Sequence, residues 1–139
     1  MEYMNSLKIE DIIYRSGDVF LPKDMRDYLQ QYIIGDDTSL FYVSRWTIVH
    51  FWTGFIISII LRFLLHSHNI YTLTFQIHML WELWQIIIGM TPWMTLRGII
   101  DITTDTLFYM GGVWLGLHIT RRIYEALRRA TIIVLPIPP

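Results

Sequence analysis

The chain has 139 residues, of which 53% are hydrophobic, 15% aromatic and 17% charged, and its formal net charge is −1. This charge content lies below the roughly 25% of an ordinary globular domain, and the length leaves no room for a large soluble core beside membrane spans. Cysteine does not occur in the sequence, which excludes disulfides and thiolate metal sites. Composition and length therefore predict one small membrane domain.

The first 43 residues form an acidic arm that differs from the rest of the chain. They hold eight acidic and four basic side chains, and they lack the basic and apolar regions of a secretory signal. Apolar residues between positions 21 and 34 recur on one side of a helix, with Pro22 in its first turn and Gly35 at its end. The pattern predicts an amphipathic helix over residues 21–34, which lies on the membrane or packs against a partner.

Three later stretches are apolar enough, and close enough to about 20 residues, to cross roughly 30 Å of hydrocarbon. They cover residues 45–65, 71–90 and 99–120. The short turn HSHN makes the first two spans antiparallel neighbours, and Pro92 is expected to end the second. The predicted fold is therefore all-α: an integral membrane three-helix bundle over residues 44–120, preceded by the amphipathic helix.

Residues 121–139 combine a basic helix end with a proline-rich tail. The helix end carries four arginines and one acid, and this excess predicts that the C-terminus lies on the cytoplasmic or equivalent inner side. Arg45 and Arg97 then fall on the opposite side, against that rule. The tail, residues 131–139, is expected to leave the helix and, together with the acidic arm, to contact other protein subunits. Topology explains the arginines, so we expect no nucleic-acid partner.

Ionisable residues inside the predicted spans are the strongest functional candidates. Three acids occur at membrane depth, Glu82, Asp101 and Asp105, and each costs at least a few kcal/mol there. His50 and Gln85 lie on the polar stripes of their own spans. A helix rises about 1.5 Å per residue, so counting from the span ends places these groups about 10 Å below one surface. The sequence therefore predicts one polar cluster shared by three helices.

Two interpretations of this cluster compete. In the first, the carboxylates exchange hydrogen bonds with neighbouring polar groups and hold the bundle in register without a ligand. In the second, they bind a lipid head group or a divalent metal, and carboxylate with imidazole suits Mn, Fe or Zn. The metal ligands would be His50, Glu82, Asp101 and Asp105, whereas His78 lies one turn deeper. No established metal-binding spacing occurs, so we favour the first interpretation, which needs no cofactor.

Two glycines in the third span form a GxxxG pattern. Gly112 and Gly116 are four residues apart, so they lie on one face of the helix. A face without side chains lets another backbone approach closely. Ordinary helix packing is the expected role of this pair.

Short motifs within residues 45–116 resemble those of the VanZ-like and YjdF-like small membrane proteins of bacteria. The motifs are WELWQ in one span and RGIIDITTDTLFYMGG in the next, with a histidine in the preceding span. The resemblance implies these family positions: Glu82, Gln85, Asp101, Asp105 and Gly111, with His50 matching the YjdF-like histidine. This chain differs in having three spans rather than four or more, and no firm reaction belongs to those families. The motifs are also similar to those of membrane proteins encoded by large DNA viruses.

Together these features predict an integral membrane protein that anchors or supports a larger assembly. Examples are a virion inner-membrane or minor capsid protein, or a subunit of an organellar complex. Neither a nucleophile pattern nor a phosphate-binding glycine loop occurs, so no catalytic residues are expected. The alternative is a VanZ-like membrane protein with an intramembrane carboxylate and histidine site for a metal or lipid head group. If the protein is an anchor, we expect the carboxylates to be fully hydrogen-bonded to other protein groups. If it has a metal or lipid site, we expect a pocket beside them.

Overall fold

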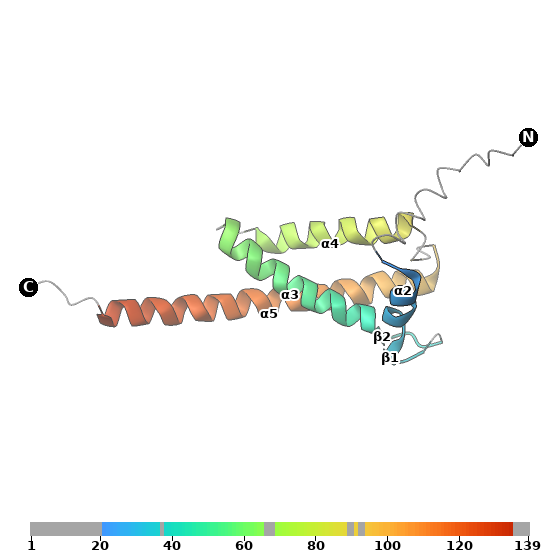
Figure 1. The fold of residues 1–139 in the computed structure, drawn as a ribbon, viewed down its shortest axis with the longest axis horizontal. Coiled ribbons are helices and arrows are strands. Elements are labelled where there is room, and N and C mark those ends of the chain that lie inside the picture. Colours follow the sequence, from blue (N-terminus) through green and yellow to red (C-terminus); the bar gives the residue numbers. More distant parts are fainter. Residues whose placement is uncertain (1–20, 37, 66–68, 89–90, 92–93, 135–139) are drawn as a thin grey trace, which may run out of the picture.

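A computed structural model describes residues 21–36, 38–65, 69–88, 91 and 94–134 of the chain. Within this part the chain forms four helices and one small two-stranded sheet, which confirms the mainly helical fold (Figure 1). The elements in chain order are α2 (Lys23–Leu29), β1 (Tyr32–Ile34), β2 (Val43–Ser44), α3 (Arg45–Leu65), α4 (Ile70–Ile87) and α5 (Leu96–Val134).

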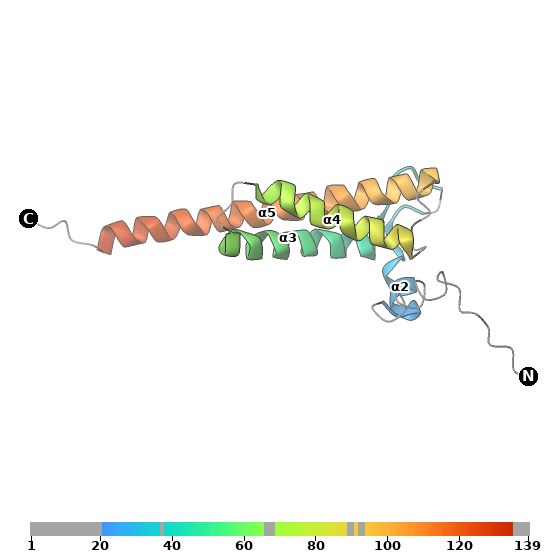
Figure 2. The same cartoon turned by 90° about the horizontal axis from the view of Figure 1, so that it is seen from above.

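The three long helices lie side by side and form a bundle, with α2 and the sheet at one end (Figures 1 and 2). At the other end α5 continues beyond α3 and α4 and remains helical to Val134. The prediction that the chain leaves the helix at residue 131 is therefore wrong. Residues 135–139 lie outside the described part.

Glycines allow α3 and α5 to make the most extensive contact in the bundle. A β-carbon at Gly112 would fall on the carbonyl oxygen of Phe51, and one at Gly54 would fall on that of Tyr109. Gly116 lies against α3 at the same seam. The two backbones therefore meet where side chains are missing, which is the packing role expected from the GxxxG pattern.

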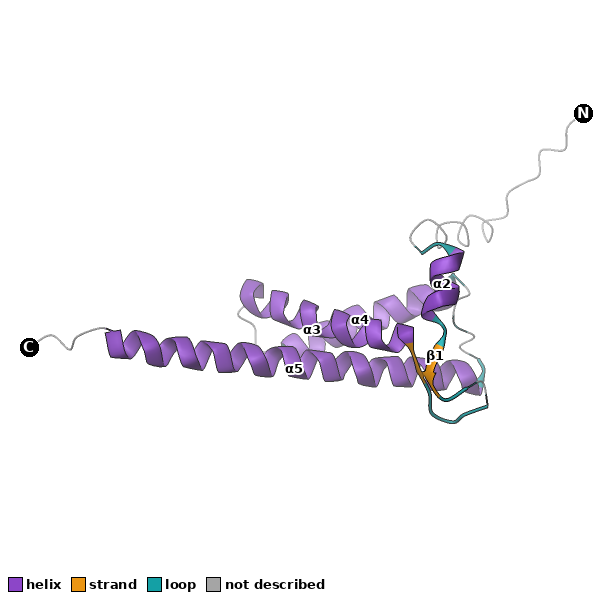
Figure 3. Cartoon of the chain, turned by 60° about the horizontal axis from the view of Figure 1, so that its bottom comes forward, coloured by secondary structure: helices purple, strands orange, loops and turns teal. Residues whose placement is uncertain are grey.

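The predicted amphipathic helix over residues 21–34 is wrong in its extent. It ends at Leu29, and Tyr32–Ile34 forms β1, which pairs antiparallel with β2 (Figure 3). The two isoleucines of this stretch are β-branched, which lowers helix propensity and favours a strand. Gly35 then has φ +76°, a conformation that favours glycine, where the chain turns back towards β2. The described part of the arm thus folds onto the bundle end, and residues 1–20 lie outside it.

Burial in the bundle follows the polar stripes of the sequence. The buried polar side chains of the long helices are Thr47, His50, Ser58, Thr74, His78, Glu82, Gln85, Thr104, Asp105 and Thr120. Apolar side chains of the same helices are exposed instead, among them Ile56, Ile60, Leu80, Leu83 and Leu107. A water-soluble domain places these two classes the other way round.

One helix of the described part, α3, is long and apolar enough to cross a membrane by length and composition, with mean hydropathy 2.0. The other two long helices overlap the predicted spans over residues 71–90 and 99–120, but polar and charged side chains interrupt them. Those side chains include Gln76, Glu82 and Asp101. Residues 89 and 90 lie outside the described part, as do Pro92 and Trp93.

Candidate functional site

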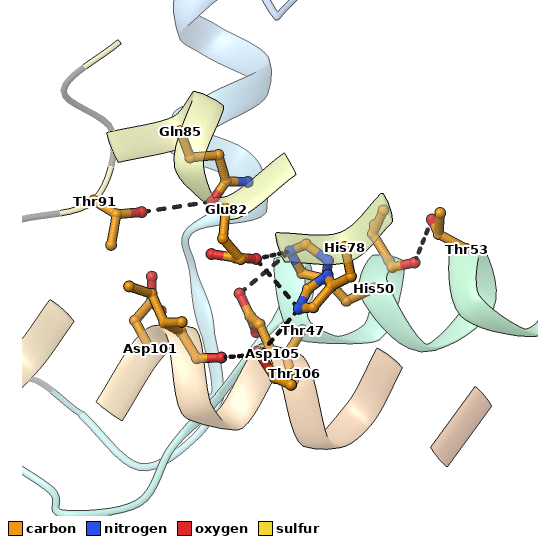
Figure 4. Close-up of polar contacts among 12 residues, drawn as sticks. Thr47, His50, Thr53, His78, Glu82, Gln85, Thr91, Asp101, Asp105 and Thr106 are labelled. Carbon is orange, nitrogen blue, oxygen red and sulfur yellow. Dashed lines mark hydrogen bonds and ion pairs between the residues drawn. The ribbon is translucent and has the colours of Figure 1, made fainter. Parts of the chain in front are cut away.

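Four ionisable side chains from the three long helices meet in the bundle interior (Figure 4). His50 on α3, Glu82 on α4 and Asp105 on α5 are only 4%, 2% and 1% exposed. His50 Nε2 lies 3.6 Å from Glu82 Oε1 and 3.3 Å from Asp105 Oδ2. His78 Nε2 on α4 lies 3.6 Å from the same Glu82 oxygen. We call these four residues the buried cluster.

Helical spacing and close helix packing explain why these side chains meet. His78 and Glu82 are four residues apart on α4, so they share one face. His50 precedes Gly54 by four residues, and at that glycine α3 approaches the backbone of α5. The approach brings the imidazole of α3 within reach of Asp105. Sequence analysis left His78 outside the expected ligands because of its depth, although its spacing from Glu82 was the signal that places it here.

The buried cluster is short of hydrogen bonds. Among the described residues, neither oxygen of Glu82 has a hydrogen-bond partner, and neither does His50 Nε2; Asp105 has only the Thr47 hydroxyl beside it as a donor. The contacts within the cluster, at 3.3–3.6 Å, exceed the usual hydrogen-bond length of about 2.7–3.2 Å. A carboxylate that has lost water without gaining donors costs several kcal/mol. A proton or a cation must therefore neutralise these groups.

The spacing of the donor atoms fits a shared metal ion. One donor atom each from His50, His78 and Glu82 lies within 4.8 Å of the others. Two ligands about 2.1 Å from a tetrahedral ion are about 3.4 Å apart, which is close to the 3.3 and 3.6 Å separations around His50. Imidazole nitrogen combined with carboxylate oxygen is a donor set for Zn, Mn or Fe. Within the buried cluster, His50, His78 and Glu82 have the donors and the spacing for one divalent ion, and Asp105 adjoins them at His50.

His78 has a competing partner within this arrangement. Its Nε2 lies 3.1 Å from Thr106 Oγ1, and that hydroxyl already donates to the Ile102 carbonyl at 2.6 Å. Thr106 therefore accepts from the imidazole, so His78 Nε2 carries the proton here. Metal binding through this nitrogen requires the bond to Thr106 to break. His50 and Glu82 are accordingly the first donors, and His78 joins them once that bond breaks. Asp105 is a second carboxylate beside this group, 3.3 Å from His50 Nε2.

Asp101, a predicted ligand, lies apart from the buried cluster (Figure 4). Its Oδ1 accepts a 2.6 Å hydrogen bond from the Tyr42 hydroxyl, which joins the arm to α5. Burial, and then this hydrogen bond, raise the pKa of Tyr42 above its ordinary value. The hydroxyl therefore stays protonated and remains a donor at physiological pH. In this arrangement Asp101 holds the arm in place.

Replacing Tyr42 with phenylalanine is expected to loosen the arm. The change removes the donor to Asp101, and a hydrogen bond to a charged group contributes about 1.5–3 kcal/mol. Faster amide hydrogen exchange over residues 30–44 is the expected result. Tyr28→Phe is the matched control, because it keeps the ring that faces Arg45 and removes an exposed hydroxyl. Equal exchange in the two variants would contradict the role of the Tyr42 hydroxyl.

Gln85, also a predicted member of the cluster, connects α3 and α4. With its carboxamide oxygen facing two indoles, it accepts from Trp46 Nε1 at 2.8 Å and from Trp81 Nε1 at 2.7 Å. The other end of the carboxamide faces the Thr91 hydroxyl (Figure 4). Both indole donors are thereby satisfied beside the buried cluster. Gln85 therefore positions the two helices that carry His50 and Glu82.

Two arginines hold the arm on the bundle end. The Arg97 guanidinium carbon lies 3.6 Å from the Tyr42 ring centroid, and its Nη1 donates to the Asp36 carbonyl at 3.1 Å. The Arg45 guanidinium carbon lies 4.0 Å from the Tyr28 ring centroid. Such cation–π contacts contribute about 0.5–1 kcal/mol at exposed sites. These contacts give both arginines a local role in binding the arm.

Two cavities lie at the arm end of the bundle, and one of them reaches the buried cluster. The first, which we call the vestibule, has a volume of about 200 Å³ between the arm and the bundle end, and Tyr42, Gln85 and Asp101 are among the residues that line it. The second, which we call the apolar groove, has a volume of about 380 Å³. Side chains of α3 and α4 form its walls, and His50, His78 and Tyr109 contribute its polar atoms. Of the two, only the apolar groove is lined by members of the buried cluster, His50 and His78.

Comparison of the chain with protein-family profiles, curated protein sequences and solved structures found no match. The resemblance to VanZ-like and YjdF-like proteins, and to viral membrane proteins, therefore stays a prediction that depends on the motifs alone. The chemistry of the site has to be inferred from its own donors, distances and burial.

Proposed function

We propose that the chain is an integral membrane protein of three spans whose buried cluster binds one divalent transition-metal ion. One observation is the main support for metal binding. Both oxygens of Glu82 lie buried near His50 Nε2 and have no hydrogen-bond partner among the described residues, and the buried Asp105 has only the Thr47 hydroxyl beside it as a donor. Carboxylates used as structural contacts between helices would be expected to have donors instead.

The reversed burial of the bundle supports the membrane environment. Lipid tails suit the exposed apolar faces of α3, α4 and α5, and polar groups in a membrane bundle face its interior. The 21 residues of α3 have the length that a span requires. The arginine excess after residue 120 favours an inner C-terminus.

Charge balance also favours a divalent ion. Glu82 and Asp105 together carry two negative charges when both are ionised, and metal ligands bind in their deprotonated forms. A divalent ion with two neutral imidazoles then leaves the site with no net charge. A neutral site is the least costly one in surroundings of low dielectric constant.

Anchoring of a larger assembly is a second candidate function. The part of α5 beyond the bundle favours it, because Ile123 and Tyr124 are exposed there and could meet another subunit. Two features favour the metal site instead. Tyr42 and Arg97 bind the arm to its own bundle, and the carboxylate of Glu82 lacks hydrogen bonds within the described part.

Metal analysis of the gently solubilised protein tests the proposal. We expect close to one Zn, Mn or Fe ion per wild-type chain, and its loss in Glu82→Gln and in Asp105→Asn. Changing a group that merely orients a ligand weakens metal binding by about 10- to 100-fold, so changing a ligand is expected to cost more. His78→Gln is expected to weaken binding less than His50→Gln, because His78 gives up a hydrogen bond to Thr106 on binding.

Asp101→Asn is the matched control for these substitutions. It removes a carboxylate of the same span but keeps the oxygen that accepts from Tyr42. This variant should retain the metal. A metal-free wild type, after separate incubation with each of the three ions, would contradict the proposal, as would metal retained by folded Glu82→Gln and Asp105→Asn. In those cases protonated carboxylates would explain the buried cluster.

A further inference from the structure

The apolar groove beside the buried cluster has the character of a site for one hydrocarbon chain. Its walls include Val49 and Ile57 from α3, Ile77 from α4 and Met25 from α2. Val49 and Met25 remain exposed, so the groove is open to the surroundings of the bundle. Its volume of about 380 Å³ lies at the lower end of the roughly 300–1,000 Å³ typical of ligand sites. That size favours one chain over two.

Polar atoms occur in the groove next to the buried cluster. His50, His78 and Tyr109 all line it, and all are buried. The Tyr109 hydroxyl has no hydrogen-bond partner among the described residues. Its ring stacks on that of His78, with centroids 4.4 Å apart. A ligand in the groove would therefore place a polar group near the buried cluster and an apolar chain along α3 and α4.

The charge of the proposed metal site determines whether the head group of the ligand should be neutral or anionic. A divalent ion is already balanced by Glu82 and Asp105, so an anionic ligand would leave a net negative charge in a site of low dielectric constant. An uncharged oxygen keeps the balance, can complete the coordination of the ion, and can accept a hydrogen bond from Tyr109. We propose that the apolar groove binds a single-chain amphiphile with a hydroxyl or carbonyl head group, which reaches the metal. This inference rests on the proposed function.

Photo-crosslinking of the full chain in detergent micelles tests this inference. Three probes share one long alkyl chain with a diazirine and differ in their head groups, which are a hydroxyl, a carboxylate and a phosphate. We expect the alcohol to label residues lining the groove most strongly and the phosphate least. Ile57→Trp fills the groove and should reduce alcohol labelling at least tenfold. Ile60→Trp is the matched control on the exposed face of α3 and should not change it.

Metal content measured in the same samples separates the two proposals. Loss of labelling in Ile57→Trp with normal metal content supports the groove as the ligand site. Val49→Trp blocks the open side and repeats the test with less disturbance of packing. Labelling that is equal in wild type and both groove variants, or strongest for the phosphate probe, would overturn the inference and leave the metal site standing. A metal-free wild type that is still labelled in the groove would refute the proposed function and the head-group assignment together.

Discussion

Replacing Ile56 with aspartate is expected to reduce insertion of the chain into a bilayer by more than 100-fold. Ile56 lies near the middle of α3, and its side chain is 51% exposed. Aspartate at the centre of a membrane helix costs about 2.5–3.5 kcal/mol, and isoleucine contributes about −0.3 to −0.6 kcal/mol. In water, the same exchange at an exposed position usually changes stability by less than about 0.5 kcal/mol. A large loss of insertion would therefore show that lipid surrounds the exposed face of α3, and a small change would show that water does.

Ile123→Asp is the matched control for this prediction. The same residue type is 50% exposed at that position, but on α5 beyond the predicted end of the third span. Arg121 and Arg122 precede it and favour the new negative charge. Both variants would be translated with isolated membranes, and the fraction resistant to alkaline extraction would be compared. Equal resistance in the two variants would show that lipid does not contact the exposed face of α3.

Replacing Gly112 with alanine should separate α3 from α5 and destabilise the protein by about 2 kcal/mol. The added β-carbon falls on the Phe51 carbonyl, and two backbones cannot adjust as flexible side chains do. Overpacking of this kind costs about 1–3 kcal/mol, partly offset by the higher helix propensity of alanine, worth up to about 1 kcal/mol. His50 and Asp105 lie on the two helices that are forced apart, so metal affinity should fall as well.

Gly111→Ala provides the comparison, since it makes the same chemical change one residue earlier. Its β-carbon would meet the Phe51 ring at 3.9 Å, an ordinary contact. Helix propensity then dominates, and this variant should be as stable as wild type or up to about 1 kcal/mol more stable. Unfolding in mixed micelles by increasing amounts of a denaturing detergent measures both. If Gly112→Ala unfolded at the same point as Gly111→Ala, the close backbone contact would be refuted.

The sequence predicted the helices and the inward polar stripes because both depend on local periodicity. Residues three or four apart share a helix face whatever surrounds them, so the approach of His50, Glu82 and Asp105 followed from spacing and depth. The positions of Gly112 and Gly116 at a helix seam followed from the same rule. These inferences needed no knowledge of the arm.

The partner that each polar side chain or strand contacts could not be predicted in the same way. Asp101 has the same spacing as a cluster member, but Tyr42, 59 positions away in sequence, supplies a donor that turns it towards the arm. No periodicity reveals such a pairing. The strand Tyr32–Ile34 was missed for the same reason, because it depends on pairing with β2 across a turn. His78 lies one turn deeper than Glu82, so depth alone excludes it, whereas its spacing of four residues places it on the same face of α4.

The 39 residues of α5 form one uninterrupted helix, which makes it a rod about 58 Å long at 1.5 Å per residue. That is nearly twice the roughly 30 Å hydrocarbon thickness of a bilayer. In the proposed arrangement, about 14 residues after position 120 extend some 20 Å from the membrane surface. Because a helix bends little over this distance, any partner held at its far end would stand at a fixed height above the lipid, and shortening α5 by whole turns would lower that height in steps of about 5 Å.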